Sequence, residues 1–262
     1  MENLMKFSKT IFSALLLAST ATFADTYNGE VELRYFGNGA SVGDTLLIID
    51  NVSSLQIRGT YNFSAVDTTN KPLAEADFLG KHSFINASYS SIDSDDSNYF
   101  DLSNSKSIGA GFYIPNSIFY IGAGYAELDD SNDTVVSLGI TPIDGLLITT
   151  SHNDEAKDYS LNLSAKYVTQ LAGDTAINLE TGYKKGRDAE DDFEEDKDDT
   201  IYVAADYYFN SRLSVGAAFI DAEASVYIIR SRYFYSEKVS FKAEAISADN
   251  QGAFNLGAAI RF

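Results

Sequence analysis

Six basic residues occupy alternate positions in segments that read as β-strands. Successive side chains of a strand point to opposite faces, so residues two apart share a face. Guanidinium and ammonium groups on one face attract anions and pair with carboxylates, which is electrostatic rather than covalent chemistry. The basic residues are Arg34, Arg58, Arg230, Arg232, Lys242 and Arg261, and the acidic residues in the same phase are Glu32, Glu180, Asp206 and Glu244.

The chain holds only two histidines that could act as general bases. His152 stands beside Ser151 and Asp154, a cluster that a lipase or protease would need, whereas His82 precedes a strand. No second partner for either histidine is recognisable. We therefore expect no enzymatic activity and keep a hydrolase as the alternative.

The acidic run Asp188–Asp199 suggests calcium binding, but it lacks the ligand spacing and the turn glycine of an EF-hand. Such a run is usually a solvated loop, so we expect no metal and no cofactor. There is no cysteine, which excludes disulfides and thiol chemistry. The net charge of −19 argues against nucleic acid as a partner.

Residues 1–24 have the pattern of a secretory signal peptide. Lys6 and Lys9 give a positive start, Ile11–Ala18 is apolar, and Thr22–Ala24 is a small-x-small cleavage site. Removal of this segment, which also contains Glu2, leaves 17 basic and 37 acidic side chains, a net charge of −20. We therefore expect two parts, a signal peptide over 1–24 and a single domain over 25–262.

Period-two alternation predicts that this domain is all-β. No segment is apolar for the roughly 20 residues of a membrane-spanning helix, whereas many alternate over the length of a tilted barrel strand. We predict a transmembrane antiparallel β-barrel of about 14 strands, with 12 or 16 as alternatives. The alternating segments cover residues 30–35, 55–63, 85–89, 108–112, 119–125, 135–141, 146–151, 159–167, 177–184, 201–209, 213–219, 227–235, 239–245 and 251–262.

The connections between these segments alternate in length. Short turns such as Ile114–Ser117 and Pro142–Gly145 are interleaved with longer acidic connections such as Glu127–Asp133. Outer-membrane barrels have short periplasmic turns and longer extracellular loops, so the alternation favours a membrane barrel. The exception is Ala65–Gly80, which is long but falls on the short-turn side; a helical turn, a plug in the barrel mouth and an ordinary connector all fit it.

Two segments resemble known outer-membrane proteins. The amphipathic end Ala258–Phe262 resembles the signal that barrels of Gram-negative bacteria present to their insertion machinery, with Phe262 as its last residue. The octet Pro72–Leu79 resembles a segment of the general porins of these bacteria. The resemblance implies an outer-membrane porin, a passive diffusion channel for small hydrophilic solutes in contact with lipid and lipopolysaccharide.

The basic residues fall on the inward phase of five strands that become neighbours when the barrel closes. General porins, which this resembles, set a basic wall opposite acidic groups, and the field sorts solutes by charge. The alternative is that salt bridges merely keep the lumen polar. The pore is narrowed either by Gly37–Asn51, which also fits an extension of the second strand, or by Ala65–Gly80. A barrel enzyme, a non-conducting adhesin-like barrel and a homotrimer are further alternatives.

Overall fold

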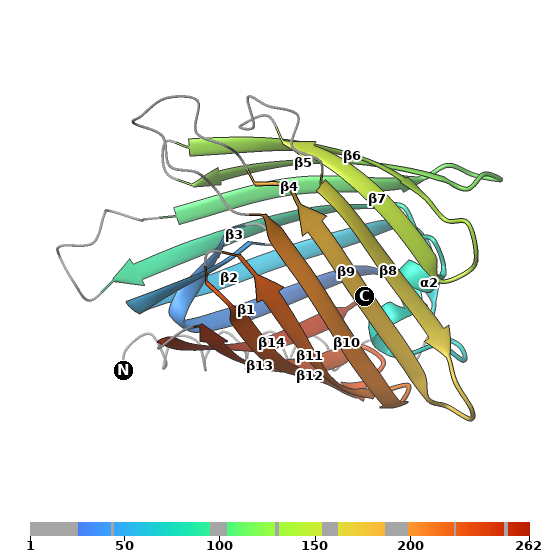
Figure 1. Ribbon diagram of the computed structural model, residues 1–262. Helices are drawn as coiled ribbons and strands as arrows, with labels where there is room; N and C mark the ends of the chain where they lie inside the picture. Colours follow the sequence, from blue (N-terminus) through green and yellow to red (C-terminus); the bar gives the residue numbers. More distant parts are fainter. Residues whose placement is uncertain are drawn as a thin grey trace.

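The protein is a closed barrel of fourteen antiparallel strands (Figure 1). Each strand pairs with its neighbours in the sequence, and β1 pairs with β14 to close the ring. The computed structural model describes residues 26–42, 45–94, 104–128, 131–153, 162–186, 199–222, 224–248 and 251–262. The strands are β1 (Thr26–Val42), β2 (Thr45–Asp67), β3 (Phe84–Ser94), β4 (Asn104–Tyr113), β5 (Phe119–Leu128), β6 (Ser131–Ile140), β7 (Leu146–Asn153), β8 (Asn162–Gln170), β9 (Ala176–Lys184), β10 (Thr200–Asn210), β11 (Leu213–Asp221), β12 (Val226–Ser236), β13 (Val239–Ala248) and β14 (Gln251–Arg261).

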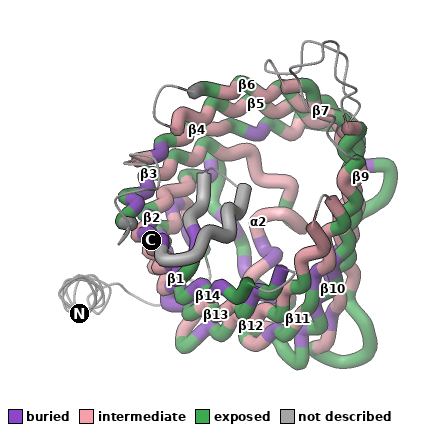
Figure 2. The backbone as a smooth tube through the Cα atoms, turned by 60° about the vertical axis from the view of Figure 1, so that its left-hand side comes forward, coloured by how far each residue is buried: buried purple, intermediate pink, exposed green. Residues whose placement is uncertain are grey.

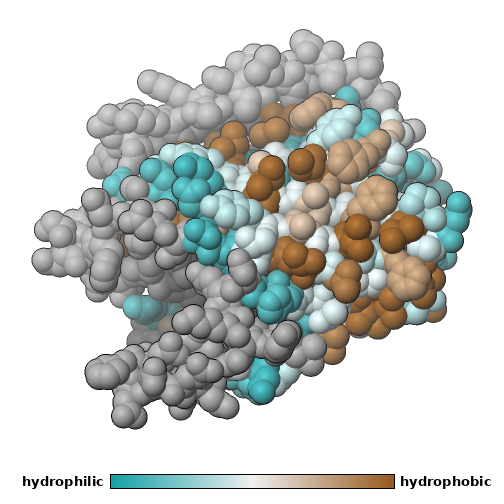
Figure 3. Space-filling view, turned by 90° about the horizontal axis from the view of Figure 1, so that it is seen from above, coloured by the Kyte–Doolittle hydropathy of each residue, from teal (hydrophilic) through white to brown (hydrophobic). Residues whose placement is uncertain are grey.

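Alternation decides which face of each strand points outward. On β5, Ile121 and Tyr125 are 44% and 40% exposed, and glycines stand between them. Large apolar side chains remain exposed around the whole barrel, and Figure 3 shows them gathered on the outside of the wall. An apolar outer surface on a barrel with a polar interior is the pattern of a protein whose solvent is lipid.

The predicted barrel and its strand number are confirmed, but the strict alternation of connection lengths is wrong. Only two residues separate β1 from β2, β5 from β6, and β13 from β14, although these connections lie on the side predicted to be long. The strands continue through residues such as Glu127 and Asp133 that the sequence suggested were loop. Long connections on that side, here called the loop end, are 95–103, 154–161 and 185–199. The predicted signal peptide and most of the acidic run lie outside the described residues.

The connector between β2 and β3, residues 68–83, folds into the opposite end of the barrel, here called the connector end. It contains a 3₁₀ turn, η1 (Leu73–Glu75), and the short helix α2 (Ala76–Leu79). Figure 2 shows α2 inside the ring of strands, and Ala76 packs against Tyr27 and Val66. No helix in the described residues is long and apolar enough to cross a membrane. The helical turn and the inward fold foreseen for Ala65–Gly80 are both present.

At the loop end, β1 and β2 extend beyond the wall as a hairpin. Their register breaks around Asn38, which has a φ of +56°, and its amide donates to the Gly252 carbonyl (3.0 Å). Bulges bend strands, and β1 comes close to β4 and β5, which are not its neighbours in the sheet. Gln56, on the lumen face below this bend, is fully buried. The described parts of Gly37–Asn51, residues 37–42 and 45–51, are therefore extensions of β1 and β2.

Candidate functional site

Most charged residues of the lumen lie on one side of the barrel, formed by β8–β10, β12–β14 and β1. We call this side the charged wall. Together with Glu75 of the connector it holds a set of six bases and six acids, nearly all of which form ion pairs or hydrogen bonds within the set. They are Arg34, Lys166, Arg230, Arg232, Lys242 and Arg261, and Glu30, Glu32, Glu75, Glu180, Asp206 and Glu244.

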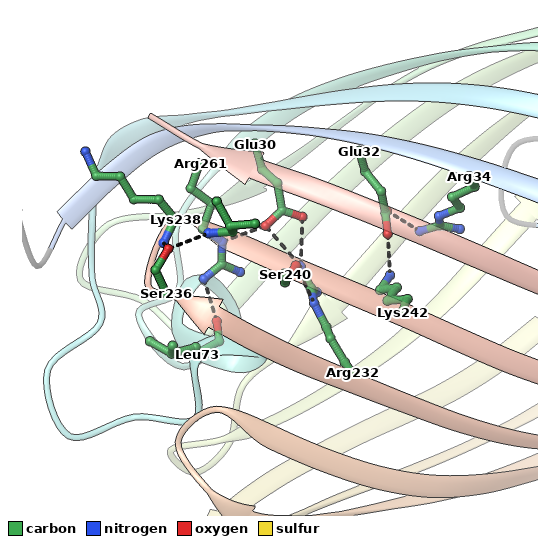
Figure 4. A network of polar contacts seen from close by, with 11 residues as sticks. Glu30, Glu32, Arg34, Leu73, Arg232, Ser236, Lys238, Ser240, Lys242 and Arg261 are labelled. Atoms are coloured by element: carbon green, nitrogen blue, oxygen red, sulfur yellow. Dashed lines mark hydrogen bonds and ion pairs between the residues drawn. The ribbon is translucent and has the colours of Figure 1, made fainter. Parts of the chain in front are cut away.

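Neighbouring strands supply opposite charges to the first cluster (Figure 4). Glu30 of β1 accepts from Arg261 of β14 (2.6 Å) and from Arg232 of β12 (3.1 Å). Glu32 contacts Arg34 (2.6 Å) and Lys242 of β13 (3.1 Å). Because each carboxylate lies between two cations, the cluster carries a small positive excess that is spread over four strands.

A second cluster lies further round the same wall. Arg230 of β12 donates to both oxygens of Asp206 on β10 (2.7 and 2.6 Å) and reaches Glu180 on β9 (3.4 Å). The Tyr202 hydroxyl and the Asn178 amide also donate to Glu180. A two-pronged guanidinium–carboxylate contact fixes orientation as well as charge, so this cluster is rigid.

The connector is tied to strands far apart in the ring. Glu75 accepts from Tyr208 of β10 (2.6 Å) and pairs with Lys166 of β8 (2.7 Å), whose ammonium also lies 4.9 Å from the centre of the Phe78 ring. On the side of β14, Arg261 donates to the Leu73 carbonyl (2.8 Å). Strands β8 and β14 are six positions apart, so the connector crosses the connector end of the lumen.

The predicted basic and acidic residues lie on the lumen face of their strands, whereas Phe262 is exposed. The arrangement of these charged residues differs from the one expected for a transverse field. The acids stand beside the bases on the charged wall and not opposite to them. Glu244 accepts from Asn255 (2.8 Å), and Arg58 of β2 stands opposite Glu32 in the β1–β2 pairing. Salt bridges that keep the lumen polar fit these contacts; a role of the bases in ion selectivity stays a prediction.

Three charged residues of these contacts were not predicted from the sequence: Glu30 and Lys166 of the charged wall, and Glu75 of the connector. Glu30 and Lys166 share the phase of residues that were chosen, so alternation alone could have found them. No local signal marks Glu75, because its partner Lys166 is 91 positions away.

The opposite side of the lumen is nearly free of charge. Strands β3–β7 present glycine, serine and other small or neutral side chains, and we call this side the glycine wall. Among its described lumen-facing residues the only charged one is Asp133, which accepts from the Asn153 amide (2.8 Å). Its glycines are Gly109, Gly111, Gly122, Gly124 and Gly139.

The two histidines lie at opposite ends of the barrel. His152, near the loop end of β7, is exposed on the outward face. His82 lies near the end of the connector, where its Nδ1 is 2.8 Å from the Ser64 hydroxyl and burial lowers the pKa of the ring. They cannot converge on one substrate.

Comparisons with known proteins agree with this fold. The structure of the outer-membrane protein Omp33 of Acinetobacter baumannii superposes with a TM-score of 0.72 at 21% identity, over 92% of this chain and all of that one. The KdgM porin (TM-score 0.45, 11% identity, 89% and 99% covered) and a triple mutant of the Rhodopseudomonas blastica porin (0.43, 11%, 90% and 99%) are more distant. A search of curated proteins found no match.

The family comparison goes further than the fold. The sequence model of the family described as "Putative general bacterial porin" matches residues 5–141, which is more than half of the chain. Its match agrees with a closed barrel whose outside is apolar and whose lumen is polar. The protein is therefore a member of the general bacterial porin family, an outer-membrane porin.

Proposed function

We propose that this porin is a passive diffusion pore for small hydrophilic solutes. The observation that carries the proposal is the division of the lumen into a charged wall, whose ions pair with one another, and an uncharged wall of small residues. Paired ions are held in place, whereas small side chains leave room. Solutes therefore pass along the glycine wall.

Two inward-folded segments define the path. The connector narrows the connector end, which we place on the periplasmic side, through its contacts with Lys166, Tyr208 and Arg261. At the loop end, which we place on the extracellular side, β1 comes close to β4 and β5 across the lumen. Solutes must pass both segments, so their positions, rather than the diameter of the barrel, set the size limit.

The proposal extends to export and assembly. Residues 1–24 are removed as a signal peptide, and β14 with Phe262 is read by the barrel insertion machinery. The backbone of Phe262 pairs with that of Gly29 (2.9 Å in both directions), so this residue also completes the seam between the first and last strands. Light scattering of the detergent complex distinguishes a single barrel from a homotrimer.

The proposal includes no catalytic step. A hydrolase needs a base, a nucleophile and an orienting group within reach of one substrate. The histidines are separated by the length of the barrel, and the family suggests a channel that is not an enzyme.

The test is single-channel conductance of the refolded protein in a planar bilayer, with the reversal potential measured under a salt gradient. Stable open steps support a pore. A folded, heat-modifiable barrel that stays silent would favour the adhesin-like or enzymatic alternative.

A further inference from the structure

Three aromatic rings lie inside the lumen at the connector end of the glycine wall. Phe84 begins β3, Tyr113 ends β4 and Tyr120 begins β5, and the rings of Tyr113 and Tyr120 are 4.9 Å apart. Each ring is only partly buried. They are the only aromatic side chains that the described parts of β3–β7 turn toward the lumen.

Glycines allow two of these rings to lie against the wall. A Cβ atom on Gly111 would stand 2.5 Å from the Tyr120 hydroxyl and 2.7 Å from the Phe84 ring, and one on Gly139 would stand 3.2 Å from the Tyr120 ring. Any larger residue would push the rings into the passage. The glycines therefore keep the rings flat and the passage wide.

A cavity of about 350 Å³ adjoins the rings. Phe84 and Tyr120 line it together with bare main chain at the glycines and with hydroxyl and amide groups, and its size falls within the range of ligand pockets, about 300 to 1,000 Å³. Its polar side chains are Asn86, Ser107, Ser137 and Asn153, and its charged residues are Arg58 and Asp133.

We propose that this cavity is a subsite for the ring of a neutral, polyhydroxylated solute such as a monosaccharide. Aromatic rings offer a flat apolar surface to the C–H face of a sugar, and hydroxyl and amide groups match its hydroxyls. One charge of each sign gives the cavity no net attraction for acids or bases. The inference rests on the proposed pore function and deepens it by naming a class of solute.

The experiment measures binding without needing an open pore. Saturation-transfer NMR of the detergent-refolded full barrel is run with methyl β-glucoside as the probe. Sorbitol, which has the hydroxyls but no rigid ring, is the comparison. We expect saturable transfer to the glucoside, concentrated on its ring C–H protons, and clearly weaker transfer to sorbitol.

Two sets of variants assign the site. Phe84→Leu and Tyr120→Leu are expected to weaken binding roughly two- to tenfold per ring, the value of one aromatic contact. Phe112→Leu, on the lipid face of β4 and outside the cavity, is the control. Gly124→Leu tests the cavity without touching the rings, because a Cβ there meets nothing closer than 3.8 Å, and it should abolish binding.

Gly182→Leu is the matched control on β9, where the nearest atom to an added Cβ is 3.7 Å away. Binding that is absent, or equal in wild type and Gly124→Leu, overturns the subsite. So does equal transfer to glucoside and sorbitol, which would mean that the rings only support the glycine-rich wall. A silent barrel that binds the glucoside would contradict the pore and leave the subsite standing.

Discussion

At the residue scale, the lumen bases differ in how far they are exposed. Arg261 is 3% exposed, donates to Glu30 and Leu73, and lies over the rings of Tyr27 and Phe234. Arg58 is more exposed and borders the cavity of the glycine wall. A buried base acts mainly on the stability of the barrel, whereas a base that borders the cavity also acts on passing ions.

We therefore expect different effects when Arg58 and Arg261 are each replaced by uncharged glutamine. Arg58→Gln is expected to shift the reversal potential toward cations, because it removes a positive charge that borders the cavity beside the path. The prediction that Arg34 and Arg261 act in the same way remains to be tested by the same measurement. An unchanged reversal potential in Arg58→Gln would exclude a role for this residue in selectivity.

Arg261→Gln is expected to act mainly on stability. We expect a loss of about 2 kcal/mol, less than the roughly 3–5 kcal/mol typical of removing one partner of a fully buried pair, because Glu30 keeps Arg232. Urea unfolding in lipid vesicles measures the loss, with Lys81→Gln as a control, since its pair with Asp144 is exposed. Equal stability of the two variants would contradict this assignment.

At the scale of elements, the connector is the part whose position the sequence could not predict. The strands follow from alternation, which depends only on neighbouring residues. The inward fold of α2 depends on contacts such as Glu75–Lys166, between residues far apart in the chain. The predicted lengths of the connections at the loop end were wrong for a related reason. Hairpin pairing continues through polar residues such as Glu127 and Asn132, and polarity alone does not mark a loop.

The connector's anchors yield a prediction about conductance. Glu75→Gln should weaken the contact with Lys166 and loosen α2, so the mean conductance or its fluctuation should rise. A chain in which residues 70–79 are replaced by a short Gly-Ser turn should show the larger effect. Single-channel recording measures both, and Asp174→Asn, at the exposed turn between β8 and β9 of the same end, is the control. Equal conductance in all four proteins would mean that the connector does not lie in the path.

The seam of the barrel is a second element with a testable role. Deletion of Phe262 removes backbone pairing with Gly29 as well as the terminal aromatic residue. Assembly in the outer membrane should fall, measured as the heat-modifiable fraction in isolated envelopes. Phe262→Tyr retains the backbone and an aromatic ring and should assemble normally. Undisturbed insertion of the deletion variant would remove the terminal signal from the proposal.

At the scale of the whole molecule, the charges of the lumen nearly balance, whereas the rest of the chain carries an excess of acidic residues. The six bases of the charged wall are balanced by acids, including Glu75 of the connector, whereas the chain as a whole has a net charge of −19. The acidic excess therefore lies outside these clusters, and the sequence places a dense part of it in Asp188–Asp199, on a connection at the loop end. Such a field concentrates cations at the mouth, whereas paired charges in the lumen select weakly.

The contrast between acidic charge at the mouth and paired charges in the lumen predicts how ion selectivity depends on salt concentration. We expect a cation-selective reversal potential at low ionic strength that declines toward zero near 1 M, because the screening length falls from about 10 Å at 0.1 M to about 3 Å at 1 M. The measurement keeps a fixed concentration ratio across the bilayer at two mean salt concentrations. Neutralising the acids of 188–199 should remove the low-salt preference and leave the high-salt value unchanged. An anion preference, or a cation preference that persists in high salt, would place control of selectivity in the lumen, with Arg58 as the first residue to test.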